Sequence, residues 1–220
     1  MRIDIWSDVI CPFCWIGKRH LEKALKSFRA QHPDIPVEVV WRAYELDPTS
    51  PKVTDDQDTE TSAQMLSRKY GMPLNEAEAG QEQMAARFDE LGLTFDWRSA
   101  RVCSTFDAHR LAALAAEHGQ ADAVDEALRR AHFSEGRAIS DPVVLREIAS
   151  GAGLPADAVD RLLDGDGHAD TVRQDVEMAR EIGVRGVPFF VFDGRLAVSG
   201  AQPVEVFEQA LHQALDGADD

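Results

Sequence analysis

Two cysteines, Cys11 and Cys14, stand two residues apart near the start of the chain. Residues 2–6 before them alternate between polar and apolar side chains and predict a strand. Apolar residues recur at helical spacing behind them, from about Pro12 to Arg29. This order places Cys11 at a helix N-terminus, where unpaired N–H groups and the helix dipole favour negative charge. We therefore expect a lowered pKa for the Cys11 thiol, and interpret Cys11 as a nucleophile and Cys14 as its resolving thiol.

The other strand signals lie toward the two ends of the chain. Residues 36–44 are rich in β-branched and aromatic side chains and predict a second strand, parallel to the first. Strands are also predicted at 187–192 and 196–199, on either side of Asp193-Gly194, a dipeptide typical of hairpin turns. A helix at 203–215 closes the pattern. Because a hairpin is antiparallel, these strands together predict a mixed sheet.

The middle of the chain is predicted to be helical. Residues 49–60 carry prolines and an acidic run, and predict an exposed loop. Helical patterns then cover residues 62–70, 75–91, 105–117, 121–133, 142–150, 155–163 and 168–182. The fold class is therefore α/β, with a sheet domain in two halves, 1–48 and 183–220, interrupted by a helical insertion at 49–182. The last helix of the insertion, at about 168–182, is a candidate to pack on the sheet domain.

Composition narrows the classes of partner. The formal net charge of −16 argues against nucleic acid or an anionic membrane as the main partner. No segment approaches about 20 consecutive apolar residues, and no basic region followed by an apolar run opens the sequence. We therefore expect no membrane span and no signal peptide. Three cysteines do not make a disulfide framework, and the expected compartment is the reducing cytoplasm.

Other interpretations of the cysteine pair have to be weighed. Half of a zinc site would need about four ligands, but Cys103 is far away and the seven histidines show no ligand-like spacing. We therefore predict no metal site, although two ordinary buried cysteines remain an alternative. Phe13 between the thiols adds no charge, so the helix dipole is the main influence on the pKa of the Cys11 thiol. Asp8 would raise the Cys11 pKa by like charge if it lay close, but a solvated loop position is the simpler expectation.

A second motif is Gly183-Val184-Arg185-Gly186-Val187-Pro188. Proline rarely heads a buried strand because it cannot donate a hydrogen bond to the ladder. One interpretation is an ordinary proline of an edge strand. The other is a cis Val187–Pro188 bond that faces the cysteine pair and turns the Val187 backbone outward to pair with an extended substrate.

Taken together, these motifs resemble the DsbA-like thioredoxin-fold superfamily. Within it they are similar to the FrnE branch, which is related to 2-hydroxychromene-2-carboxylate isomerases and kappa-class glutathione transferases. The resemblance rests on the Cys-Pro-Phe-Cys motif and on residues 4–8, 15–18, 41–48, 105–111 and 183–190. It implies a thioredoxin fold with a mixed sheet and a large all-helical insertion domain, Cys11 and Cys14 as the redox pair, and Pro188 as the cis proline. The sequence departs from the pattern of this branch at Cys103-Ser104, where the branch commonly has asparagine near a glutathione-binding cleft.

The leading hypothesis is a thiol–disulfide oxidoreductase acting on protein or glutathione disulfides, with glutathione as a candidate co-substrate and no tightly bound cofactor. The candidate substrate-binding residues are Trp6, Pro12, Phe13, Trp15, His109, Arg110 and Val187. Related proteins are often dimers, so a homodimer is a further expectation. One alternative is a glutathione-dependent isomerase of an aromatic or polyketide-like small molecule, although the related isomerases use a serine near the first cysteine position. The other is a non-enzymatic, chaperone-like binding module with a hydrophobic face around Trp6, Phe13 and Trp15.

Overall fold

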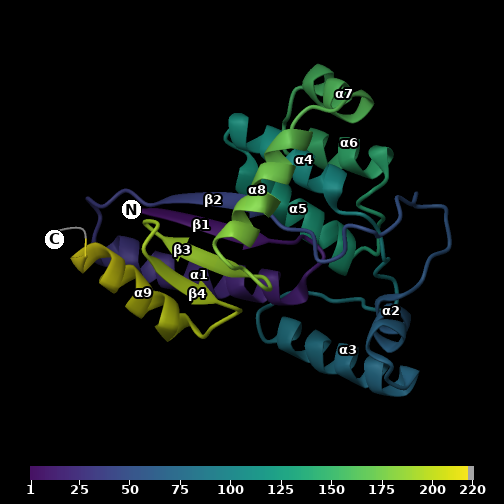
Figure 1. Cartoon of the computed structure of the whole chain (residues 1–220), viewed down its shortest axis with the longest axis horizontal. Helices are drawn as coiled ribbons and strands as arrows, with labels where there is room; N and C mark the ends of the chain where they lie inside the picture. Colours follow the sequence, from purple (N-terminus) through teal and green to yellow (C-terminus); the bar gives the residue numbers. More distant parts are fainter. Residues whose placement is uncertain (218–220) are drawn as a thin grey trace. The chain divides into compact units, whose positions relative to one another are not determined.

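The computed structural model describes residues 1–217, which form two compact units. The sheet unit contains Met1–Leu46 and the chain from Arg173 onward, and the helical unit contains Asp47–Val172. Figure 1 labels the helices and strands of both units. The C-terminal half of the sheet unit begins inside a helix at Arg173, earlier than the predicted boundary at residue 183. None of the described helices combines the length and apolar character that crossing a membrane requires.

A four-stranded sheet forms the centre of the sheet unit. Its strands are β1 (Arg2–Ser7), β2 (Glu38–Ala43), β3 (Phe189–Phe192) and β4 (Leu196–Ser199), in the order β2-β1-β3-β4. β1 runs parallel to β2 and antiparallel to β3, and β3 is antiparallel to β4. Asp193 and Gly194 are the central residues of a turn closed by the Arg195 N–H and the Phe192 carbonyl oxygen (3.0 Å), and both have positive φ, +48° and +68°. The predicted mixed sheet is confirmed.

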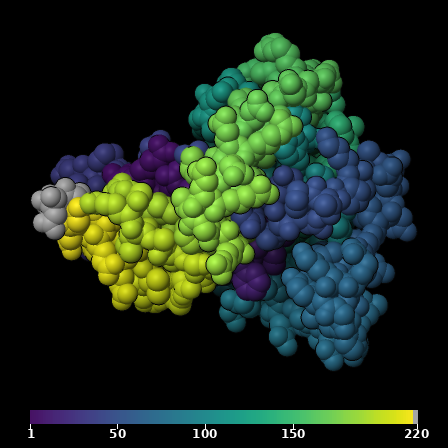
Figure 2. All heavy atoms as spheres, viewed as in Figure 1, coloured from purple at the N-terminus to yellow at the C-terminus, as the bar shows by residue number. Residues whose placement is uncertain are grey.

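Two helices pack on one face of this sheet, α1 (Pro12–Gln31) and α9 (Val204–Asp216). Side chains alternate across a strand, so every second residue of β1 and β3 points to this face. The buried apolar core here is made of Ile3, Ile5, Leu21, Leu25, Phe28, Phe190, Phe192, Phe207 and Leu211. Each of these side chains contributes about 1.5–3 kcal/mol by its burial. In Figure 2 the hairpin and α9, coloured olive to yellow, form a continuous part of the visible surface.

α8 (Ala169–Glu181) packs on the other face of the sheet through its part from Arg173 onward. Ala179 of this helix and Val184 behind it lie in an apolar cluster with Trp6 of β1. The Trp6 indole donates a hydrogen bond to the Asp175 carbonyl oxygen (2.9 Å). The Asp175 carboxylate accepts hydrogen bonds from Arg42 Nη1 (2.9 Å) and from the backbone N–H of Ala43 (3.0 Å). One aspartate therefore attaches α8 to both parallel strands.

The helical unit contains α2 (Ser62–Tyr70), α3 (Leu74–Asp89), α4 (Phe106–Glu117), α5 (Ala121–Phe133), α6 (Pro142–Gly151) and α7 (Ala156–Asp164). α4 packs against α5, α6 and α7, and α2 packs against α3. A cluster of three rings, Phe88, Phe95 and Phe133, with centroids 5.1–5.4 Å apart, joins α3 to the end of α5. These helices agree with the predicted ones to within a few residues.

The acidic segment at 49–60 is held more firmly than an exposed loop. Val53 is buried, and its backbone N–H and C=O both bond to the Ser140 hydroxyl, at 2.9 and 2.7 Å. The Asp55 carboxylate accepts hydrogen bonds from the Ala138 N–H (2.6 Å) and from Arg137 Nε (3.0 Å). The prediction of an exposed loop is therefore wrong for Val53. Its partners lie more than 80 residues further along the chain, where no local pattern reveals them.

Candidate active site

Cys11 is the N-cap residue of α1, and its backbone is extended, with φ −86° and ψ 115°. Pro12 occupies the first helical position, where no N–H is needed. A backbone turn precedes the helix, because the Cys11 N–H donates to the Asp8 carbonyl oxygen (3.1 Å) and the Cys14 N–H donates to the Cys11 carbonyl oxygen (3.0 Å). Cys11 is 4% exposed and Cys14 1% exposed. No disulfide joins any of the described cysteines.

The Val187–Pro188 segment lies directly against the first cysteine. The Cys11 Sγ is 3.7 Å from the Val187 carbonyl oxygen, and the two residues are 176 positions apart in sequence. The Val187–Pro188 peptide bond is cis, the isomer that the resemblance implies. On its other side, the Pro188 carbonyl oxygen accepts a hydrogen bond from the Gly200 N–H (2.8 Å). The structure thus brings together the two sequence motifs, Cys-x-x-Cys and Val-Pro, that were predicted to share one site.

The aromatic side chains around the cysteines have different environments. Phe13, between the two thiols, is 42% exposed. Trp6 and Trp15 are 3% and 2% exposed, so their rings belong to the interior. Pro12 and Val187 are half-buried. Of the three side chains predicted to form a hydrophobic face, only Phe13 is at the surface.

Asp8 occupies the loop between β1 and α1, just before Cys11. It is completely buried, and its Oδ2 accepts a hydrogen bond from the Leu46 N–H (2.8 Å). The expectation of a solvated loop aspartate is therefore wrong. The carboxylate instead joins the loop that carries the cysteines to the chain that leaves β2.

The chain matches the family described as "DSBA-like thioredoxin domain" over residues 2–212. It belongs to this DsbA-like family. The family prediction is confirmed, while the FrnE branch within it stays a prediction.

Known relatives of this DsbA-like chain cover nearly its whole length. The crystal structure of a probable DsbA oxidoreductase, SCO1869 from Streptomyces coelicolor, is 44% identical. It has a TM-score of 0.89 over 98% of this chain and 90% of that one. The uncharacterized protein YwbO of Bacillus subtilis is 26% identical over 219 residues, 96% of each chain. The cytosolic disulfide reductase DsbM from Pseudomonas aeruginosa, solved with GSH, is 18% identical. Its TM-score is 0.64 over 98% of this chain and all of that one, and this likeness shows the fold alone.

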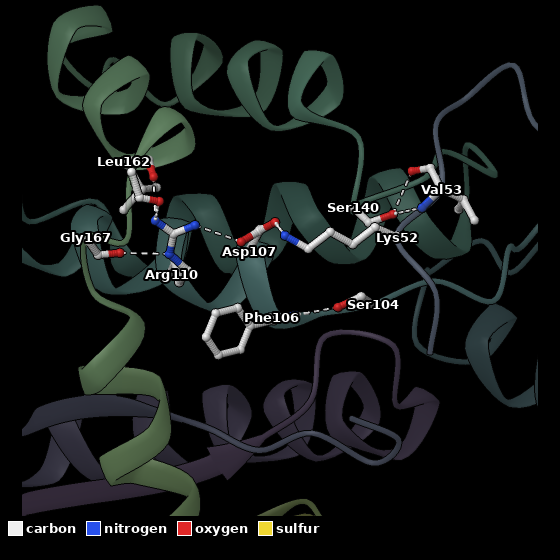
Figure 3. A network of polar contacts seen from close by, with 10 residues as sticks. Lys52, Val53, Ser104, Phe106, Asp107, Arg110, Ser140, Leu162 and Gly167 are labelled. Carbon is white, nitrogen blue, oxygen red and sulfur yellow. Dashed lines mark hydrogen bonds and ion pairs between the residues drawn. The ribbon is translucent and has the colours of Figure 1, made fainter. Parts of the chain in front are cut away.

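His109 and Arg110, two of the predicted substrate-binding residues, lie on α4 of the helical unit and are 6% and 4% exposed. Arg110 Nε donates to the Gly167 carbonyl oxygen (2.8 Å), and Nη2 donates to the carbonyl oxygens of Gly165 (2.7 Å) and Leu162. Figure 3 shows this guanidinium directed at the segment that follows α7. Arg110 therefore stabilises the C-terminal end of α7 and the segment that follows it. A role of either residue in substrate binding stays a prediction.

Asp107 completes this polar network. Its two carboxylate oxygens accept hydrogen bonds from Lys52 Nζ and from Arg110 Nη1. Burial raises the pKa of Asp107, but the hydrogen bonds and positive charges of these two partners outweigh it, so the pKa lies below its usual range. Cys103, on the segment leading into α4, is fully buried. Within residues 1–217 no group of three or more His, Cys, Asp or Glu side chains is arranged to hold a metal ion.

Two residues of this DsbA-like sheet unit that shape the site were not among the predicted ones. Gly17 faces Pro188 from α1, and Asp175 attaches α8, which leads into the Val187–Pro188 segment, to the sheet. A glycine inside a helix costs about 1 kcal/mol relative to alanine, so its presence there points to a packing reason. No local signal marks Asp175, because its partners lie on β1 and β2, more than 130 residues away.

Proposed function

We propose that this DsbA-like chain is a thiol–disulfide oxidoreductase with Cys11 as its nucleophile and Cys14 as its resolving thiol. The observation that carries the proposal is the position of the Cys11 sulfur. It lies at the N-cap of α1 and 3.7 Å from the carbonyl oxygen of Val187. The positive end of the helix dipole stabilises a thiolate at this position. In the proposed mechanism, the Val187 backbone beside this sulfur pairs with the chain on either side of a substrate cysteine.

The proposed cycle begins when the Cys11 thiolate attacks one sulfur of a substrate disulfide. A Cys11–substrate disulfide forms, the substrate S–S bond breaks, and the second substrate sulfur leaves as a thiolate that takes up a proton. Cys14, as its thiolate, then attacks the Cys11 sulfur, which forms the Cys11–Cys14 disulfide and releases the first substrate sulfur as a thiol. The substrate is reduced by two electrons and the protein is oxidised by two.

Recycling needs a thiol donor, and we propose glutathione or a dithiol protein for this step. Two molecules of glutathione would reduce the Cys11–Cys14 disulfide and leave as glutathione disulfide. The fold likeness to DsbM, a cytosolic disulfide reductase solved with GSH, supports glutathione as the small thiol and the cytoplasm as the compartment. The exposed Phe13 ring is the candidate contact for an apolar residue of the substrate.

The test uses single turnovers of the reduced protein. The substrate is a linear peptide whose one cysteine is blocked as a disulfide with 2-mercaptoethanol. Acid quench and mass spectrometry then follow the free peptide and the state of Cys11 and Cys14. We expect the wild-type chain to release the peptide, Cys11→Ser to release none, and Cys14→Ser to accumulate a peptide–Cys11 disulfide. Cys103→Ala is the matched control, because it removes a buried cysteine of the helical unit, and it is expected to act like wild type.

Two outcomes would contradict the proposal. Peptide release that survives Cys11→Ser would remove the nucleophile from the mechanism. If the wild-type chain releases no peptide but isomerises an aromatic glutathione conjugate, and Cys11→Ser does so equally well, the isomerase alternative holds instead. The direction of the cycle follows from the reduction potential of the pair: about −270 mV indicates a reductant, and about −120 mV an oxidant.

A further inference from the structure

Gly17 lies on α1, further along the same helix as Cys11 and Cys14, on a face that is buried. A Cβ atom built on Gly17 would lie 3.0 Å from Pro188 Cγ, 3.2 Å from Phe190 Cζ and 3.5 Å from Ala201 Cα. None of these atoms is the far end of a flexible side chain: one is in a proline ring, one in a fully buried aromatic ring and one in the backbone. The helix therefore approaches Pro188 as closely as it does only because residue 17 has no side chain.

The segment that Gly17 touches is held from other directions too. The Pro188 carbonyl oxygen accepts the Gly200 N–H at 2.8 Å, which fixes it to the end of β4. Gly200 has φ +82°, a conformation that residues with a side chain rarely adopt. His20, one turn after Gly17 on α1, bonds through Nδ1 to the Gln202 carbonyl oxygen at 2.7 Å. The Pro188 segment is thus enclosed between α1 and the chain that follows β4.

We propose that Gly17 is a positioning residue that sets the distance between Cys11 and the Val187 backbone. This inference rests on the proposed oxidoreductase function and adds how the site selects extended peptide disulfides. Such a substrate has to satisfy two elements at once: its backbone pairs with Val187 while its sulfur reaches Cys11 on α1. α1 approaches Pro188, the residue next to Val187, closely at Gly17, so the missing side chain of Gly17 sets the separation of the helix from Pro188. A small disulfide without a peptide backbone needs only Cys11.

Adding one methyl group should therefore separate the two classes of substrate. In Gly17→Ala the new Cβ must push α1 and Pro188 apart by a few tenths of an ångström, which displaces the Val187 carbonyl oxygen from the Cys11 sulfur. A misplacement of about 1 Å in a reacting pair can cost about a hundredfold in rate. For the smaller shift here we expect about a tenfold loss with the peptide disulfide. The rate of attack on a small disulfide should stay within about twofold of the wild-type rate, because the helix N-terminus around Cys11 is unchanged.

The experiment measures single-turnover oxidation of the reduced protein with two probes that share one leaving group. They are the 2-mercaptoethanol-blocked peptide and hydroxyethyl disulfide, the latter without any peptide backbone. Gly80→Ala is the matched control, because Gly80 is also inside a helix, on α3, and its added Cβ meets nothing within 4 Å. We expect Gly17→Ala to lose rate only with the peptide, and Gly80→Ala to lose rate with neither probe.

The other outcomes overturn the inference in distinguishable ways. If wild type and Gly17→Ala react equally with the peptide, Gly17 has no positioning role and the proposed function stands. An equal loss with both probes means a general structural effect, which also refutes positioning. A wild-type chain that reacts with neither probe refutes the proposed function and this inference together. If Gly17→Ala does not fold, His20→Ala replaces it, since it frees the Gln202 end of the chain that encloses Pro188 without adding an atom. A peptide-selective loss in that variant supports the inference, and unchanged rates with both probes overturn it.

Discussion

The attachment of α8 to the sheet gives a quantitative prediction for Asp175→Ala. The substitution removes the acceptor of two hydrogen bonds, from the Ala43 N–H and from Arg42 Nη1. Ala43 is 6% exposed, so its N–H is left unsatisfied in the interior, at a cost of about 1–3 kcal/mol. The Arg42 side chain is 22% exposed and keeps Asp4 as a partner, so the loss of its second ion pair adds only about 0–1 kcal/mol. We expect the free energy of unfolding to fall by about 1–4 kcal/mol.

Urea denaturation followed by far-UV circular dichroism measures this loss, and a thermal scan should show a midpoint about 2–16 °C lower. Asp175→Asn separates the two contributions, because the amide oxygen can still accept the Ala43 N–H while the charge is lost. It should therefore lose less stability than Asp175→Ala. Asp157→Ala is the control, since that residue forms an exposed i,i+4 pair with Arg161, and its midpoint should match wild type. If Asp175→Ala also unfolds like wild type, Asp175 does not hold α8 on the sheet.

Two further predictions concern the helical unit. The folded pKa of Asp107 lies below its unfolded value of about 3.9. Its stabilisation is therefore present above about pH 4 and lost as the pH falls through the folded pKa. Asp107→Asn should be less stable than wild type at pH 7, with a difference that narrows below pH 4 in urea titrations, and a constant difference would refute the assignment. Gly136→Ala should lose about 2–4 kcal/mol by urea denaturation, because φ is +64° and the new Cβ would lie 2.5 Å from Ser99 Cβ. Gly71→Ala, at φ +65° with open space around it, should lose only about 1–2 kcal/mol, and equal losses would argue against the clash.

Local spacing was sufficient to predict the secondary structure because local interactions decide it. The helix predicted from Pro12 to Arg29 runs to Gln31 in the structure. Its apolar residues recur with the helical period, and α1 buries them on one face. The hairpin at Asp193-Gly194 follows from two residues that tolerate positive φ. The segment at 49–60 shows where local information ends. Prolines and acidic residues predicted exposure, but Ser140 and Ala138, from a distant part of the chain, hold Val53 and Asp55 in place.

The candidate site also combines features that the local sequence predicts with features that depend on distant parts of the chain. The cysteine pair could be predicted because one short motif contains the thiols, the helix start and the N1 proline. The proximity of Cys11 and Val187 was one of two interpretations of the Val-Pro motif, and the family resemblance favoured it, because 176 residues separate the two positions. The contact of Gly17 with Pro188 could be suspected only from the cost of glycine in a helix. Its partner, and therefore its role, became visible only when helix and strand were placed together.

Arg110 shows why residue type and helix position alone do not distinguish binding from structural roles. An arginine on an alanine-rich helix is equally compatible with a substrate anion and with carbonyl oxygens of the protein. A guanidinium has five N–H donors, and in this chain three protein carbonyls and the Asp107 carboxylate accept four hydrogen bonds from it. A substrate carboxylate would have to displace these partners from a side chain that is 5% exposed, and the displaced carbonyls would lose buried hydrogen bonds. Cys11 differs, because its sulfur lies at the positive end of the α1 dipole, where a negative charge is stabilised. The Arg110 donors, by contrast, are already bonded to groups of the protein itself, and only the tertiary structure provides that information.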